Sequence, residues 1–188
     1  MLNRLRDVFR SFQDRDVRYV VIGGIASVLH GVPRATFDVD ILIEATPENA
    51  QRLLDALLEA GLGTAALTTP EAVLANDITV FRDRVRIDVQ TSMPGLEFAS
   101  AWRNRKTVTY QGQDFLIVSS DDLIASKRAA GRDVDLEDVR LLELQEHGDE
   151  AIGCGSDPPS RPGPGGSGPS QTRTSRFPAY GSSGRAIG

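Results

Sequence analysis

The sequence predicts an α/β protein of the α+β kind, in which a mixed β-sheet is flanked by helices. Two apolar runs, 17–22 and 37–44, have the length and composition of buried strands. Two further pairs of short strand-like runs are joined by turn residues, which is typical of hairpins. The segments between them repeat apolar residues every three to four positions, as amphipathic helices do.

An amphipathic helix is expected first, because Leu2, Leu5, Phe9 and Phe12 recur at helical spacing. Capping signals place the later helices, for example a threonine, a proline and an acid at 46–48. The other expected elements follow in order: strand 17–22, helix 25–30, strand 37–44, helix 46–61, short helix 70–75, hairpin 78–81 with 85–90, helix 96–102, hairpin 107–110 with 114–118, and helices 119–130 and 133–147.

Composition excludes several classes of protein. The chain has 188 residues and a net charge of -5, which argues against a protein that coats DNA. Its single cysteine, Cys154, excludes an internal disulfide and a four-cysteine zinc site. The first residues contain no apolar run of signal-peptide length, and the longest apolar run is too short for a membrane span. We therefore expect a cytoplasmic protein that does not bind membranes.

The composition also divides the chain into two parts. Residues 1–150 carry the apolar patterns and are expected to form one domain, which ends in the helices of about 119–147. Residues 153–188 are rich in Gly, Pro and Ser, and are expected to be a disordered tail. Arginines make this tail basic, so it is either inert or attracts a phosphate-rich partner.

Two aspartates open the second strand and are the first candidates for chemistry. Residues two apart in a strand point to the same side, about 6.6 Å apart along the chain, so Asp38 and Asp40 project together. Such close carboxylates repel each other unless a cation lies between them, and a divalent metal ion supplies one. The alternative is a pair of solvent-facing acids on an edge strand.

A third carboxylate strengthens the metal hypothesis. In the run 85–90, alternation puts Asp88 on the face opposite to its apolar neighbours. If this strand lies beside the strand of Asp38, about 4.8 Å away, the three acids form a cluster. A cluster of this kind can bind two magnesium ions that assist an in-line phosphoryl displacement. Taken alone, Asp88 reads equally as a surface acid in a hairpin.

Gly23 and Gly24 stand between the first strand and the helix that follows. Glycines at such a junction let the backbone approach a phosphate and leave N–H groups pointing at it. They serve a tight turn or close helix packing equally well. Their distance of about 15 residues from Asp38 and Asp40, with one helix between, allows both groups to face the same end of the sheet.

This combination resembles the nucleotidyltransferase superfamily typified by DNA polymerase beta, especially its small bacterial members and the nucleotidyltransferase-type toxins of toxin–antitoxin systems. The matching residues are Gly23-Gly24, Asp38-x-Asp40 and Asp88. The resemblance covers 17–90, and continues through 127–138, which looks like the lysine-bearing helical end of the small members.

The resemblance implies a polymerase-beta-like fold and a role for each of these residues. Asp38 and Asp40 would hold the metals, Asp88 would bind one metal and accept the proton of the acceptor hydroxyl, and Gly23-Gly24 would hold the triphosphate of ATP or another NTP. The cofactor would be Mg²⁺, as two ions, with Mn²⁺ as a substitute. Many relatives have serine where Gly24 stands, and Ser27 is the nearest replacement.

Two cations are further candidates for binding the nucleotide. Arg34 precedes the aspartates in a loop and could meet a phosphate, or be a surface residue. Lys127, on a later helix, could neutralise the β- or γ-phosphate. Three other charged residues are interpreted as a structural ion-pair set between the last two helices, and His30 as a helix cap; the set is Arg132, Asp135 and Asp138.

The sequence hypothesis is therefore an enzyme that transfers a nucleoside monophosphate from an NTP to an acceptor hydroxyl and releases pyrophosphate. The acceptor is left open among a tRNA end, a protein and a small molecule, and a cognate protein partner is expected if the chain acts as a toxin. A glycosyltransferase or phosphatase is disfavoured because Asp38 and Asp40 precede the apolar run of their strand. A non-catalytic binding module with the same fold, such as an antitoxin-type partner, is the remaining alternative.

Overall fold

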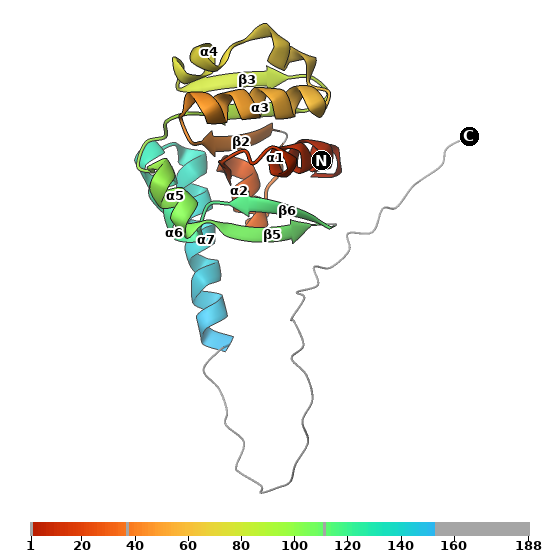
Figure 1. Ribbon diagram of the computed structural model, residues 1–188. Helices are drawn as coiled ribbons and strands as arrows, with labels where there is room; N and C mark the ends of the chain where they lie inside the picture. Colours follow the sequence, from red (N-terminus) through yellow and green to blue (C-terminus); the bar gives the residue numbers. More distant parts are fainter. Residues whose placement is uncertain (1, 37, 111, 153–188) are drawn as a thin grey trace, which may run out of the picture. The chain divides into compact units, whose positions relative to one another are not determined.

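The computed structural model describes residues 2–36, 38–110 and 112–152 (Figure 1). Helices and strands alternate irregularly along the chain. Their bounds are α1 Leu2–Asp14, β1 Tyr19–Ile22, α2 Gly23–Leu29, β2 Asp38–Ile43, α3 Pro47–Glu59, the 3₁₀ helix η1 Gly63–Leu67, α4 Pro70–Leu74, β3 Ile78–Arg82, β4 Arg86–Gln90, α5 Phe98–Asn104, β5 Lys106–Tyr110, β6 Gln113–Ile117, α6 Ser120–Ala130 and α7 Asp133–Ile152.

The strands form one six-stranded sheet in the order β3-β4-β2-β1-β6-β5. Three neighbouring pairs are antiparallel, namely β1 with β2, β3 with β4 and β5 with β6. Two pairs are parallel, β2 with β4 and β1 with β6. The mixed sheet confirms the predicted α+β class.

Each face of the sheet has its own hydrophobic core. On one face, α1 and α3 pack their apolar stripes against alternate residues of the strands, such as Val21 and Ile41. On the other face, α5, α6 and α7 cover Val20, Ile22 and Leu42. In Figure 1 these last three helices gather at one end of the strands.

The helix boundaries follow the capping signals of the sequence. The side chain of Thr46 accepts a hydrogen bond from the backbone N–H of Asn49 at the start of α3. Ser119 caps α6 in the same way through the N–H of Asp122. At the far end of α6, Gly131 takes a left-handed conformation with φ of 64°, which stops the helix and starts the turn into α7.

Three features differ from the sequence expectations. Helix α2 starts at Gly23 itself, because this residue turns the chain with φ of 63° and no separate loop is needed. The weakly patterned segment after α3 contains η1, a short 3₁₀ helix without a capping side chain to announce it. Helix α7 extends to Ile152. The prediction for 153–188 lies outside the described residues.

Of the helices described, none combines the length and apolar character that crossing a membrane requires.

Candidate active site

A hollow of about 360 Å³ lies where the end of β1, the starts of β2 and β4, and helices α6 and α7 meet. Most residues predicted to form the site line it, together with several that were not singled out. The lining residues used below are Gly23, Gly24, Arg34, Thr36, Asp38, Asp40, Arg86, Asp88, Gln90, Lys127, Arg132 and Asp135.

The pairing of β2 with β4 brings the acids of the two strands together. The strands are parallel neighbours, and the register sets Asp40 opposite Asp88 and Asp38 opposite Arg86. Residues directly opposite each other in a sheet point to the same face. Asp88 therefore lies on the same side of the sheet as Asp38 and Asp40, which is the arrangement that the sequence hypothesis needs.

Asp40 lies in the least favourable electrostatic position of the three acids. Burial raises the pKa of its carboxyl from 3.8 to about 6, and the negative charges of Asp38 and Asp88 add to this rise. A hydrogen bond from Gln90 Nε2 to Asp40 Oδ1, at 3.4 Å, and the charge of Arg132 partly offset it. A cation placed against Asp40 would remove this penalty.

Asp38 is oriented by a neutral group. The hydroxyl of Thr36 donates a hydrogen bond to Asp38 Oδ1 at 3.2 Å. Among the described residues, neither Asp38 nor Asp40 forms an ion pair with a protein cation. The two carboxylates at the start of β2 thus carry charge that the described side chains leave unneutralised.

Asp88 differs, because Arg86 holds both of its carboxylate oxygens. Arg86 Nε donates to Oδ1 at 2.8 Å and Nη2 donates to Oδ2 at 2.7 Å. Among the described residues, no three His, Cys, Asp or Glu side chains converge as a ready set of metal ligands. The chemistry of the donors, three carboxylates on one face of two adjacent strands, nevertheless fits a hard divalent cation.

Gly23 lies directly against Asp40. A Cβ atom added at Gly23 would be 2.4 Å from Asp40 Oδ2, and its φ of 63° is one that other residues rarely adopt. A Cβ atom at Gly24 would be 3.0 Å from the Thr36 hydroxyl. The two glycines thus give the backbone after β1 the room to approach the acids of β2.

A buried ion-pair network closes the hollow on the side of α6 and α7. Lys127, with a side chain only 4% exposed, lies between Asp135 Oδ1 at 3.0 Å and Asp138 Oδ2 at 2.7 Å. Arg34 binds Asp138 from the loop before β2, and Arg132 binds Asp135. The predicted ion-pair set between the last helices is therefore present, and it also includes both cations that were predicted to meet the nucleotide.

The network determines how accessible the positive charges of Arg34 and Lys127 are to a ligand in the hollow. The ammonium of Lys127 is buried and neutralised by two carboxylates, whereas the guanidinium side chain of Arg34 is 27% exposed and lines the hollow. Although burial alone would raise the pKa of Asp135, hydrogen bonds from Arg132 and Lys127 lower it. Asp135 therefore stays ionised and keeps its cations in place.

Two other predicted residues lie away from the hollow. Ser27 is fully buried, and its hydroxyl lies 3.2 Å from the carbonyl oxygen of Gly23 and 3.1 Å from Asp138 Oδ2. In this structure its hydroxyl therefore faces Gly23 and Asp138, and Ser27 is not among the residues that line the hollow. His30 is the C-cap residue of α2, as predicted, and its Nε2 donates to the carbonyl oxygen of Val118 at 2.8 Å.

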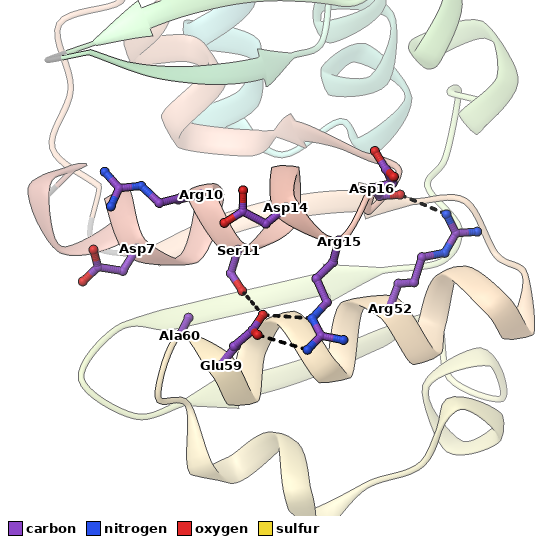
Figure 2. A pocket seen from close by; sticks show the side chains of 9 residues that line it. All are labelled: Asp7, Arg10, Ser11, Asp14, Arg15, Asp16, Arg52, Glu59 and Ala60. Carbon is purple, nitrogen blue, oxygen red and sulfur yellow. Dashed lines mark hydrogen bonds and ion pairs between the residues drawn. The ribbon is translucent and has the colours of Figure 1, made fainter.

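A larger hollow, about 590 Å³, lies between α1 and α3, and several of its lining residues bind one another across the two helices (Figure 2). Figure 2 shows Arg15 reaching from the end of α1 to Glu59 on α3, with Ser11 bonded to the same carboxylate. Arg52 donates to the backbone carbonyl of Asp16. These contacts join two helices, and none of the described residues that line this hollow is a glycine.

Sequence reasoning did not single out three residues that shape the site. Arg86 stands two positions before Asp88 on the same strand, and this spacing is itself a signal that the two side chains share a face. Thr36 and Gln90 hydrogen-bond Asp38 and Asp40. Gln90 also follows Asp88 by two positions, so strand alternation alone could have placed it.

The comparisons with known proteins agree with this architecture. The family model described as "Nucleotidyltransferase of unknown function (DUF6036)" matches residues 2–149. No curated protein matches the chain.

Solved structures resemble the chain at low sequence identity. An antigenic nucleotidyltransferase-like protein from Paracoccidioides brasiliensis is 19% identical with a TM-score of 0.50, over 74% of this chain and 73% of that one. A candidate nucleotidyltransferase from Thermotoga maritima, TM1012, is 16% identical with a TM-score of 0.46, over 79% and 92%. The antibiotic-resistance factor ANT(2'')-Ia is 12% identical with a TM-score of 0.46, over 80% and 91%.

The likeness to the Paracoccidioides protein concerns the fold alone. The family match spans most of the chain and includes every residue of the hollow described above. The chain therefore belongs to the DUF6036 family of nucleotidyltransferases.

Proposed function

We propose that the protein transfers a nucleoside monophosphate from an NTP to an acceptor hydroxyl and releases pyrophosphate. The observation that carries this proposal is the meeting of Asp38, Asp40 and Asp88 on one face of β2 and β4, beside the glycines that end β1. In the reaction, the acceptor oxygen forms a bond to the α-phosphorus while the bond from that phosphorus to the bridging oxygen breaks. Pyrophosphate leaves with the electron pair.

Asp38, Asp40 and Asp88 are the residues that would hold divalent metal, Mg²⁺ in our proposal. Bound there, the metal would supply positive charge against the phosphate oxygens and lower the pKa of the attacking hydroxyl. The raised pKa of Asp40 supports this proposal, because it reflects burial together with the negative charges of Asp38 and Asp88, which the charge of Arg132 offsets only in part.

The remaining residues of the hollow bind the triphosphate or orient the side chains that bind it. Gly23 and Gly24 leave backbone room for the triphosphate, and the partly exposed guanidinium of Arg34 faces the same space. Lys127 acts through Asp138, since it helps to hold the carboxylate that in turn positions Arg34. The proton of the acceptor hydroxyl passes to Asp88 in this scheme.

Pyrophosphate release with a mixture of NTPs and Mg²⁺ tests the proposal. We expect Asp38→Asn and Asp40→Asn each to lower the rate at least about 100-fold, because each removes charge that stabilises the transition state. Asp83→Asn, in the exposed turn between β3 and β4, makes the same charge change on the same sheet and should keep the wild-type rate. Full activity in both site variants would rule the reaction out at this site.

Labelled NTPs identify the acceptor. Purified protein is incubated with each α-labelled NTP and a total cell extract, and the label is followed into RNA, protein and small molecules. Transfer to tRNA or protein would favour a role in a toxin–antitoxin system with a cognate protein partner. Transfer to a small hydroxyl compound would favour a modifying enzyme instead.

A second candidate is a non-catalytic module that keeps the nucleotidyltransferase fold and binds a partner. The observation that favours it is the pair between Arg86 and Asp88, which occupies the third acid. This module would bind an NTP without releasing pyrophosphate, so the assay above separates the two candidates.

A further inference from the structure

The pair between Arg86 and Asp88 is the feature of the hollow that the proposed reaction does not explain. Arg86 lies across from Asp38 in the sheet, and its guanidinium takes up both oxygens of Asp88, whose side chain is only 11% exposed. Hydrogen bonding to Asp88 and the charges of Asp88, Asp38 and Asp40 all raise the pKa of Arg86. The guanidinium therefore occupies a place where three carboxylates attract a cation.

The other cations that line the hollow bind acids outside the β-sheet. Lys127, Arg34 and Arg132 bind Asp135 or Asp138, the acids on α7. Within the described part of the chain, Arg86 is the cation of this hollow whose partner is one of the three sheet acids. Its side chain is also 45% exposed, so it can leave Asp88 without disturbing the core.

Guanidinium groups suit both a carboxylate and a phosphate. The planar fork of arginine donates two parallel hydrogen bonds to either group. An arginine released from Asp88 in this hollow would find phosphate oxygens within the same space, since the hollow is lined by Arg86 together with Gly23 and Gly24. The two partners of Arg86 therefore need not be occupied at the same time.

We infer that Arg86 is an internal counter-ion that holds Asp88 while the hollow is empty, and that it exchanges Asp88 for the triphosphate when metal and nucleotide bind. The inference rests on the proposed function, since it requires Asp88 to take up metal. It assigns Arg86 two opposing effects. It competes with metal for Asp88, and it assists binding of the phosphates.

Titration calorimetry separates these two effects. Mn²⁺ alone is titrated into the metal-free protein, and inorganic tripolyphosphate is titrated into the protein saturated with Mn²⁺. Because removing a competing state raises apparent affinity, Arg86→Gln should bind Mn²⁺ about fivefold more tightly than wild type. The same variant should bind tripolyphosphate about tenfold more weakly, because it loses a charged bidentate contact.

Arg82→Gln is the matched control. Arg82 lies opposite Arg86 in the register of β3 and β4 and carries the same charge on the same face, and it is exposed. A general loss of positive charge near the acids would affect both variants alike. We expect Arg82→Gln to change either affinity less than about twofold, as a screened surface charge does.

Thermal unfolding in EDTA gives a readout that does not depend on activity. Without its counter-ion, Asp88 is left buried beside two other acids, so Arg86→Gln should melt lower than wild type without metal and gain more from added Mn²⁺. Unchanged or weakened Mn²⁺ binding in Arg86→Gln, with wild-type binding intact, would overturn the inference alone. Failure of the wild-type protein to bind either probe would overturn the proposed function as well.

Discussion

Asp135 on α7 lines the same hollow as Asp38 and Asp40 on β2, but the aspartates of the helix and of the strand differ in their partners. Asp135 and Asp138, on α7, are each bound by cations, and Lys127 lies between them. Asp38 and Asp40, on β2, receive hydrogen bonds from a hydroxyl and an amide, but no ion pair from any described side chain.

The difference separates acids that form ion pairs within the protein from acids that form none with the described side chains. A buried carboxylate with hydrogen-bonded cations is compatible with a stable fold, because its charge is balanced within the protein. Carboxylates that are crowded together without a cation oppose folding, and the raised pKa of Asp40 is the sign of that opposition. Removing one acid from each group should therefore change stability in opposite directions.

The largest change is expected for Asp138→Asn. This residue binds Lys127, Arg34 and Ser27, and it is 4% exposed. Its loss leaves buried cations short of a partner and should lower the free energy of unfolding by about 3–5 kcal/mol. Urea denaturation measures the effect. Glu137→Gln, one position earlier and in an exposed pair with Arg140, should stay within about 0.5 kcal/mol of wild type. Equal effects in the two variants would contradict a structural role for the network.

Asp40→Asn should instead stabilise the metal-free protein at neutral pH. The pKa of Asp40 is raised from 3.8 to about 6 in the folded protein, so folding favours its protonated form. The stabilisation that this protonated carboxyl contributes is fully present below about pH 4 and is lost as the pH rises through 6. Asparagine removes this loss, worth about 2 kcal/mol at pH 7.5 after allowance for partial exposure. Thermal melts in EDTA at pH 4 and pH 7.5 should show the gain at the higher pH only. A gain at both would point to a cause other than charge.

Gly23→Ala sharpens the comparison by moving Asp40 without removing it. The new methyl group meets Asp40 Oδ2 at 2.4 Å, in addition to the strain of φ at 63°. Gly112, with φ of 77° and no heavy atom within 4 Å of an added Cβ, shares the strain but not the clash. We expect Gly23→Ala to unfold with about 1 kcal/mol less free energy than Gly112→Ala. Equal losses would show that Asp40 shifts freely.

Arg15→Gln should have the smallest effect. Arg15 and Glu59 make two hydrogen bonds across α1 and α3, but their side chains are 38% and 53% exposed. Exposed ion pairs contribute little because water screens them, so the melting temperature should fall by less than about 2 °C. Differential scanning calorimetry checks this value. A fall as large as that of Asp138→Asn would remove the distinction between surface and buried pairs.

Much of the fold could be predicted from the sequence, since its signals are local. The capping residues Thr46 and Ser119 mark the starts of α3 and α6. The alternation of apolar and polar residues in 85–90 predicts which residues of β4 face the core. The 3₁₀ helix η1 has no capping side chain and no periodic apolar pattern, so the sequence does not predict it. The start of α2 at Gly23 depends on one backbone angle that composition does not reveal.

The candidate site was predictable as a set of residues but not as a set of contacts. Strand alternation places Asp38, Asp40 and Asp88, and the parallel pairing of β2 with β4 brings them together. The partners of Arg34 and Lys127 could not be predicted, because Arg34 meets Asp138 across 104 residues of chain. The packing of α6 against α7 decides which nearby acid a cation binds. No local sequence pattern predicts this packing.

The separation of 104 residues between Arg34 and Asp138 also affects when their contact can form during synthesis of the chain. A ribosome that has made the whole sheet, through Ile117 of β6, has not yet made the residue that Arg34 binds. The hollow therefore lacks one of its walls until the start of α7, with Asp135 and Asp138, has left the exit tunnel. A nascent chain from which only β1 to β6 have emerged therefore cannot complete this hollow.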